Sequence, residues 1–120
     1  GLSFKPNTDD MREAPSLVIA NLLLNAGAHV RAYDPVAMEE AKHQLGDRIT
    51  YCAEEMEAVR GADALALITE WAEFRVPDWS TVANEMNGKV LFDGRNLYRR
   101  EIVGEVGFDY FGIGQGEQPA

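Results

Sequence analysis

The sequence predicts an α/β fold with a doubly wound, mostly parallel sheet and helices on both of its faces. Three observations indicate it. Helix-like and strand-like segments alternate along most of the 120 residues. Residues 64–69 form a continuous apolar run of strand length, as in a strand buried on both faces of a parallel sheet. Residues 89–93 are expected to form another buried strand, which ends at Gly94. This alternation favours right-handed crossovers between parallel strands.

Five helices are expected. The first begins at Pro15 and ends before Gly27, the positions that these two residue types prefer at helix ends. Apolar residues recur between them at helical spacing and make an apolar face, formed by Val18, Ile19, Leu22, Leu23 and Ala26. Shorter helices are expected over residues 36–45, 54–60, 78–86 and 99–106, with Asp78 as a cap.

The first predicted strand covers only residues 1–4, which is shorter than the usual strand of about 5 or 6 residues. Because the chain also begins without Met, we expect a piece of a longer protein whose first strand is truncated. A short, edge-like first strand is the alternative. The other strands are expected over residues 29–34, 49–52, 64–69, 89–93 and 110–113, before a polar segment at 114–120.

Composition indicates one globular domain over residues 1–120, since 46% of the residues are hydrophobic. The formal net charge of −9 argues against nucleic acid and anionic membranes as partners. A single cysteine, Cys52, excludes an internal disulfide and a cysteine-based zinc site. His29 and His43 lack the spacing of paired ligands, so no metal site is expected.

Three cations are candidates for binding an anionic ligand. In doubly wound sheets, ligands bind beyond the carboxyl ends of the strands. Lys5 and Arg95 follow the first and fifth predicted strands, and we expect them to reach the same region. Arg12 precedes the first helix, where a cation opposes the helix dipole and calls for a partner. The alternatives are a solvated lysine and an ion pair between Arg12 and a neighbouring acid.

Two other functions are weighed and set aside. Asp34 ends the second predicted strand, where a dinucleotide-binding unit carries its ribose-binding acid. The turn at residues 5–10 has no glycine and two acids, so we interpret Asp34 as a strand stop. A phosphoryl-accepting receiver domain would need an aspartate after the third strand, where Ala53 and Glu54 stand instead.

Four motifs carry a resemblance to a known family. They are GLSFKPNTDDMREAPS at residues 1–16, TEW at 69–71, FDGRN at 92–96 and GFDYFGIGQG at 107–116. Their order and spacing resemble the C-terminal domain of the UDP-glucose/GDP-mannose dehydrogenase family. The resemblance extends over essentially the whole chain and implies a Rossmann-like, nucleotide-sugar (UDP)-binding domain.

The resemblance implies a cytoplasmic enzyme that oxidises the C6 alcohol of a nucleotide sugar to a carboxylate in two hydride transfers to NAD. Within the family, FDGRNLY at residues 92–98 most resembles the members that act on UDP-glucose, so UDP-glucose is the expected substrate. GDP-mannose or a UDP-N-acetyl-hexosamine is the alternative. The family's NAD-binding domain and cysteine-bearing motif do not match this chain, and Cys52 lies outside the matching motifs. This fragment is therefore expected to hold no catalytic residue and to be inactive, and the full protein is expected to be a homo-oligomer.

The resemblance also implies roles for individual residues. Phe4 and Lys5 match positions that contact the nucleotide sugar, and Arg95 matches the arginine that binds UDP. Arg12 matches a position that reaches NAD. A nucleotide-binding module without catalysis remains the alternative for the chain alone.

Overall fold

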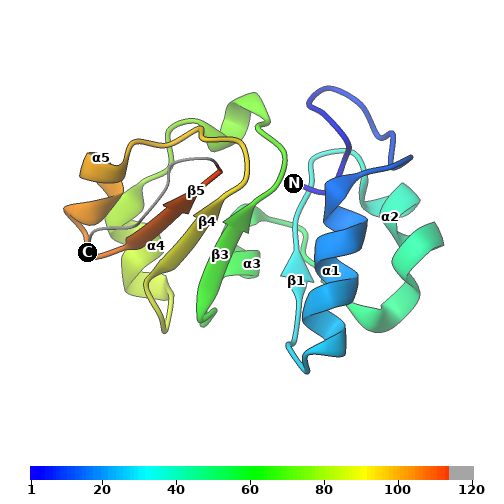
Figure 1. The fold of residues 1–120 in the computed structure, drawn as a ribbon, viewed down its shortest axis with the longest axis horizontal. Coiled ribbons are helices and arrows are strands. Elements are labelled where there is room, and N and C mark those ends of the chain that lie inside the picture. The colour runs from blue at the N-terminus through cyan, green and yellow to red at the C-terminus, as the bar shows by residue number, and fades with distance from the viewer. Residues whose placement is uncertain (114–120) are drawn as a thin grey trace. The chain divides into compact units, whose positions relative to one another are not determined.

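The structure is a computed structural model that describes residues 1–113 of the chain. The expected polar segment at 114–120, which includes the end of the GFDYFGIGQG motif, lies outside the described residues. The chain forms two compact units, Gly1–Ala58 and Val59–Ala120. Each contains parallel strands and helices, so the predicted α/β class with parallel sheets is confirmed (Figure 1). Among the described residues, no helix is both long and apolar enough to span a membrane.

The first unit contains short strands between longer helices. Its elements are α1 (Pro15–Asn25), β1 (Arg31–Ala32), α2 (Met38–Leu45), a 3₁₀ turn η1 (Gly46–Arg48) and β2 (Thr50–Tyr51), with α3 (Glu55–Val59) at the boundary. The two strands pair in parallel, Arg31 opposite Thr50 and Ala32 opposite Tyr51. Both are shorter than expected, since only two residues of each join the ladder.

Helix α1 has the predicted ends. Pro15 occupies its first position, and Gly27 follows with a left-handed φ of 91°. The N–H groups of Gly27 and Ala28 donate to the carbonyls of Leu24 and Leu23, both at 3.0 Å, which is the Schellman arrangement.

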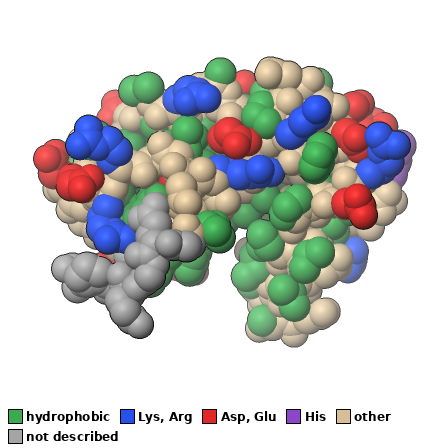
Figure 2. All heavy atoms as spheres, turned by 45° about the horizontal axis from the view of Figure 1, so that its top comes forward, with side chains coloured by type: hydrophobic (Ala, Val, Ile, Leu, Met, Phe, Trp, Pro, Cys, Tyr) green, Lys and Arg blue, Asp and Glu red, His purple; other side chains and the backbone are tan. Residues whose placement is uncertain are grey.

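The buried side of α1 is not the apolar face that the sequence pattern suggested. The helix buries Ser16 and Ala20, whereas Val18 and Leu22 are 61% and 64% exposed. Hydrophobic side chains accordingly gather on the surface over this helix (Figure 2). The reason is that apolar residues occur on nearly every side of α1. The helical spacing of apolar residues therefore does not indicate which side of this helix packs inward.

Alanines and larger apolar side chains together build the core of the first unit. One buried cluster joins the first residues to α1 and α2, and a second joins α1 to the end of α2; they consist of Leu2, Met11, Ala14, Ala37 and Ala41, and of Ala20, Leu45 and Ile49. The alanines allow the helices to approach closely, and Leu45 is among the largest fully buried side chains.

The strand expected over residues 1–4 is not formed in the structure. Leu2 and Ser3 are buried, but their N–H groups donate to the side chain of Asp34 rather than to a neighbouring strand. A carboxylate thus replaces a β-ladder as the partner of this segment.

The second unit is a three-stranded parallel sheet with helices. Its elements are β3 (Ala64–Leu67), a 3₁₀ turn η2 (Ala72–Phe74), α4 (Trp79–Glu85), β4 (Val90–Asp93), α5 (Arg100–Gly104) and β5 (Asp109–Gly112). The strand order is β3-β4-β5. Asp78 caps α4 as predicted, its carboxylate accepting the N–H of Thr81 at 3.2 Å.

Within this sheet, one face is buried and the other is open among the described residues. Leu67, Leu91 and Tyr110 are buried, whereas Phe92 and Phe111 stack on the opposite face at 48% and 38% exposure. The prediction that residues 64–69 form a strand buried on both faces is therefore wrong for this chain. Helix α4 lies behind the strands in Figure 1, on the side away from the viewer.

Candidate functional site

The Lys5 loop, residues 3–10 of the first unit, presents an aromatic ring and a cation together. Phe4 is 42% exposed, and the Nζ atom of Lys5 lies 5.9 Å from its ring centroid. The N–H of Phe4 donates to the Asp10 carbonyl at 2.9 Å, and the hydroxyl of Ser3 donates to the Lys5 carbonyl at 2.8 Å. An exposed ring beside an ammonium group suits a ligand that combines a planar base with negative charge.

Asp34 fixes the start of the Lys5 loop. Its carboxylate is fully buried, and each of its oxygens accepts two backbone N–H groups at 2.7–3.1 Å. Burial alone would raise the pKa of Asp34, but the hydrogen bonds from Leu2, Val36, Ala37 and Ser3 lower it below its usual value. The carboxylate is thus committed to the backbone, which fits its interpretation as a structural residue rather than a ribose ligand.

Arg12 forms a two-point ion pair with Asp10. Its Nε and Nη2 atoms lie 3.1 and 2.9 Å from the two carboxylate oxygens of Asp10, while its side chain is 89% exposed. These hydrogen bonds lower the pKa of Asp10 to about 2. The ion pair between Arg12 and a neighbouring acid, one of the alternatives from the sequence, is therefore present. Arg12 lies in the turn before α1, which begins at Pro15.

The Arg95 loop, residues 93–98 of the second unit, leaves the carboxyl end of β4. Gly94 donates its N–H to the Leu67 carbonyl at 2.8 Å, and a Cβ atom on Gly94 would lie 2.9 Å from that same oxygen. The Nε atom of Arg95 donates to the Ile68 carbonyl at 2.7 Å and lies 3.9 Å from Oε1 of Glu70. Glycine thus permits the turn that brings Arg95 to the end of β3.

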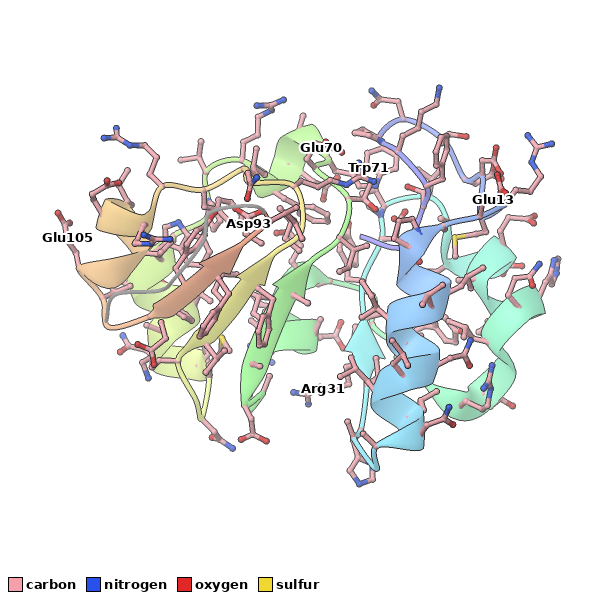
Figure 3. The ribbon with its side chains drawn as sticks, viewed as in Figure 1. Glu13, Arg31, Glu70, Trp71, Asp93 and Glu105 are labelled. Carbon is pink, nitrogen blue, oxygen red and sulfur yellow. The ribbon has the colours of Figure 1, made fainter. Side chains whose placement is uncertain are left out.

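Hydrogen bonds of Asn96 and Asp93 hold the Arg95 loop in place. The side-chain amide of Asn96 accepts the N–H of Ile113 at 2.8 Å and donates to its carbonyl at 2.7 Å. Asp93, labelled in Figure 3, is 1% exposed at the end of β4. It accepts hydrogen bonds from the N–H groups of Arg95 and Tyr98 and from the Tyr110 hydroxyl. Trp71, in the TEW motif, is 7% exposed and packs in the interior.

Two aspartates were missed by the sequence interpretation, one in each unit. Neither Asp34 as an anchor nor Asp93 as the centre of a loop was expected. A usable signal exists, since each is an acid at the carboxyl end of a predicted strand, next to Pro35 or Gly94. An acid at that point can accept the N–H groups of the turn that follows.

Cys52 is a buried free thiol. Burial and the nearby Glu57 raise its pKa, and Arg31 offsets this only in part. Such a thiol stays protonated at neutral pH and is a poor nucleophile. Among residues 1–113, no group of three or more His, Cys, Asp or Glu side chains is arranged to hold a metal ion.

Comparisons with known proteins give the family. The sequence model described as "UDP-glucose/GDP-mannose dehydrogenase family, UDP binding domain" matches residues 1–100. The chain is 48% identical to a UDP-glucose 6-dehydrogenase of Pseudomonas aeruginosa and 44% identical to UDP-glucose 6-dehydrogenase YwqF of Bacillus subtilis, over 96% of this chain in both cases. It spans only 26% of the length of each of these relatives.

Solved structures agree with this result. A UDP-glucose dehydrogenase of Pyrobaculum islandicum superposes with a TM-score of 0.76 at 37% identity, over 93% of this chain and 23% of that one. An NDP-N-acetyl-D-galactosaminuronic acid dehydrogenase of Methanosarcina mazei superposes with a TM-score of 0.81 at 28% identity, over 94% and 23% of the two chains. The chain belongs to the UDP-glucose/GDP-mannose dehydrogenase family and matches its UDP binding domain.

Proposed function

We propose that residues 1–120 are the C-terminal, UDP-binding domain of an NAD-dependent UDP-glucose 6-dehydrogenase. The whole enzyme oxidises UDP-glucose to UDP-glucuronate in two hydride transfers, and this chain alone is inactive. The observation that carries the proposal is Arg95, a partly exposed guanidinium held at the carboxyl ends of parallel strands within the family's matching segment. That edge of a parallel sheet is where such folds bind ligands.

The proposed roles follow from the chemistry of each side chain. Arg95 binds the UDP part, because a guanidinium can grip phosphate or a planar base through paired hydrogen bonds. Phe4 offers an exposed ring to the nucleotide sugar and Lys5 a compact positive charge, which acts on an anion at a distance. The net charge of −9 then favours solubility, while these local cations attract the anion.

NAD is proposed to be bound mainly by parts of the enzyme outside this chain, where it accepts hydride. Only Arg12 is assigned to it here, and its guanidinium is already paired with Asp10. A contact with NAD would therefore have to share or replace that pair. We also propose that the whole enzyme is a homo-oligomer that acts in the cytoplasm.

Calorimetric titration of the chain with UDP tests binding by this domain. We expect UDP to bind and uridine to bind more weakly, because the phosphates supply most of the attraction to cations. Arg95→Ala should weaken UDP binding by at least about tenfold, or about 1.4 kcal/mol. No heat at millimolar UDP, or equal affinity for the variant, would contradict the assigned role.

Kinetics of the whole enzyme test the substrate. Arg95→Ala should raise the KM for UDP-glucose, and Arg12→Ala the KM for NAD. A second candidate substrate is a UDP-N-acetyl-hexosamine, because a UDP-D-ManNAc dehydrogenase of Pyrococcus horikoshii superposes with a TM-score of 0.75 at 31% identity. A higher kcat/KM for that sugar nucleotide than for UDP-glucose would replace the first candidate by the second.

A further inference from the structure

The position of the Arg95 loop depends on hydrogen bonds to the carboxylate of Asp93. Asp93 lies two residues before Arg95, is 1% exposed, and ends strand β4. Its Oδ1 atom accepts the N–H of Arg95 at 3.2 Å. Its Oδ2 atom accepts the N–H of Tyr98 at 2.8 Å and the hydroxyl of Tyr110 at 2.8 Å. One carboxylate therefore joins both ends of the Arg95 loop to the neighbouring strand β5.

This arrangement determines where the side chain of Arg95 can go. With its backbone N–H held by Asp93, Arg95 leaves the turn in one direction, and its Nε atom reaches the Ile68 carbonyl at 2.7 Å. That carbonyl follows β3, the neighbour of β4 in the sheet. The path from Asp93 through the Arg95 backbone to Ile68 thus links β4 to the end of β3, and the hydrogen bond from the Tyr110 hydroxyl to Asp93 adds β5.

A buried carboxylate needs such hydrogen bonds to offset the loss of its hydration. Three donors converge on Asp93 from a backbone turn, a second backbone position and a side-chain hydroxyl. The Tyr110 hydroxyl also lies 3.2 Å from the Tyr98 carbonyl, so it contacts the same loop twice. Loss of the carboxylate would release the Arg95 backbone and the Tyr98 backbone together.

We propose that Asp93, supported by the hydroxyl of Tyr110, is a positioning residue that fixes the guanidinium of Arg95 for binding UDP. The proposal deepens the proposed function and rests on it for the ligand. Asp93 itself touches no ligand in this scheme. Its effect is to hold Arg95 in one orientation before the anion arrives, which reduces the entropy lost on binding.

The experiment follows the Arg95 Nε–H group by NMR in the chain labelled with ¹⁵Nε-arginine, and Arg95→Lys assigns the signal by removing it. Because Nε donates to the Ile68 carbonyl, we expect slow exchange of its proton with water. Asp93→Asn should accelerate that exchange by about tenfold or more, as for a lost hydrogen bond. Tyr110→Phe, which keeps the ring and removes only the hydroxyl, should accelerate it less.

Tyr51→Phe is the matched control, since the Tyr51 hydroxyl donates to the Gly46 carbonyl in the first unit and not to the Arg95 loop. It should leave the Arg95 signal unchanged. If Asp93→Asn does not fold, Tyr110→Phe still decides the question. Unchanged exchange in every folded variant of Asp93 and Tyr110 overturns the positioning role.

Titration of the same variants with UDP separates this inference from the proposed function. We expect Asp93→Asn to lower the affinity for UDP and Tyr51→Phe to leave it unchanged. If the unaltered chain does not bind UDP, the proposed function fails, while the exchange of the Arg95 proton still reports on positioning. If the chain binds UDP and Asp93→Asn binds it equally well, the role of Asp93 in binding is overturned.

Discussion

The Lys5 loop and the Arg95 loop are each held by a buried aspartate, but the two aspartates accept hydrogen bonds from different sets of donors. Each carries a candidate ligand-binding cation, and each depends on a buried aspartate. Asp34 accepts four backbone N–H groups, two of them from residues more than 30 positions away. Asp93 accepts two N–H groups from its own loop and one hydroxyl from the adjacent strand.

The difference reflects the secondary structure next to each loop. Residues 1–4 pair with no strand, so Asp34 supplies the partner that a sheet would otherwise give. The Arg95 loop follows a four-residue strand in a three-stranded sheet, so its anchor needs only to shape the turn. The cations also differ, because the Nε atom of Arg95 donates to a backbone carbonyl, whereas the ammonium of the exposed Lys5 lies 5.9 Å from the centroid of the Phe4 ring.

The largest expected effect is that of Asp34→Ala. It leaves four backbone N–H groups without their acceptor, and we expect the free energy of unfolding to fall by about 3–5 kcal/mol. Guanidinium denaturation followed by circular dichroism measures this. Asp47→Ala, which removes an exposed acid of the same unit, serves as the control and should change stability by less than about 0.5 kcal/mol. Similar losses for both variants would refute the anchoring role of Asp34.

A smaller effect is expected for Gly94→Ala in the Arg95 loop. The added Cβ would lie 2.9 Å from the Leu67 carbonyl oxygen, which is part of the backbone and cannot move aside cheaply. We expect a loss of about 1–3 kcal/mol in the same denaturation experiment. In Gly104→Ala the new Cβ meets nothing within 4 Å, so this variant should be neutral or more stable by up to about 1 kcal/mol. Unchanged stability of Gly94→Ala would show that the turn can accommodate a Cβ atom next to the Leu67 carbonyl.

Acid should weaken the first unit through Asp34. Its pKa is lowered in the folded state, so its contribution to stability is fully present above the unfolded-state pKa, about 3.9. The contribution is lost as the pH falls through the lower, folded-state pKa. The carboxyl ¹³C shift of Asp34 should therefore titrate below the ordinary aspartate value of about 3.9. A midpoint for Asp34 at or above that value would contradict the hydrogen-bonded carboxylate.

Arg12→Ala should have the smallest effect on stability. Its partner Asp10 is its near neighbour, and its own side chain is 89% exposed, so the ion pair is screened by water. We expect a change in melting temperature close to zero, measured by differential scanning calorimetry. A large decrease would mean that Arg12 supports the fold as well as the proposed contact with NAD.

Local signals in the sequence predicted much of the fold. Pro15, Gly27 and Asp78 mark helix ends by their own chemistry, and the structure places them as expected. The order of helices and strands was also predicted correctly from residue 15 onward. These features depend on residues close together in the chain, which is why a single sequence can reveal them.

Features that depend on distant partners could not be predicted in this way. Two of the four backbone partners of Asp34 are Leu2 and Ser3, so its local sequence can indicate the turn that follows it but not the distant segment that it anchors. The exposed side of α1 and the open face carrying Phe92 follow from what does and does not pack against them.

Mapping UDP onto the chain by NMR tests the central claim most directly. In a ¹H–¹⁵N spectrum recorded with increasing UDP, the account predicts shifts at Phe4, Lys5 and Arg95 and little change at Arg12. The Arg95 Nε–H signal should move furthest, because its guanidinium is proposed to bind UDP. Shifts confined to other parts of the chain, or no shifts at millimolar UDP, would contradict the account.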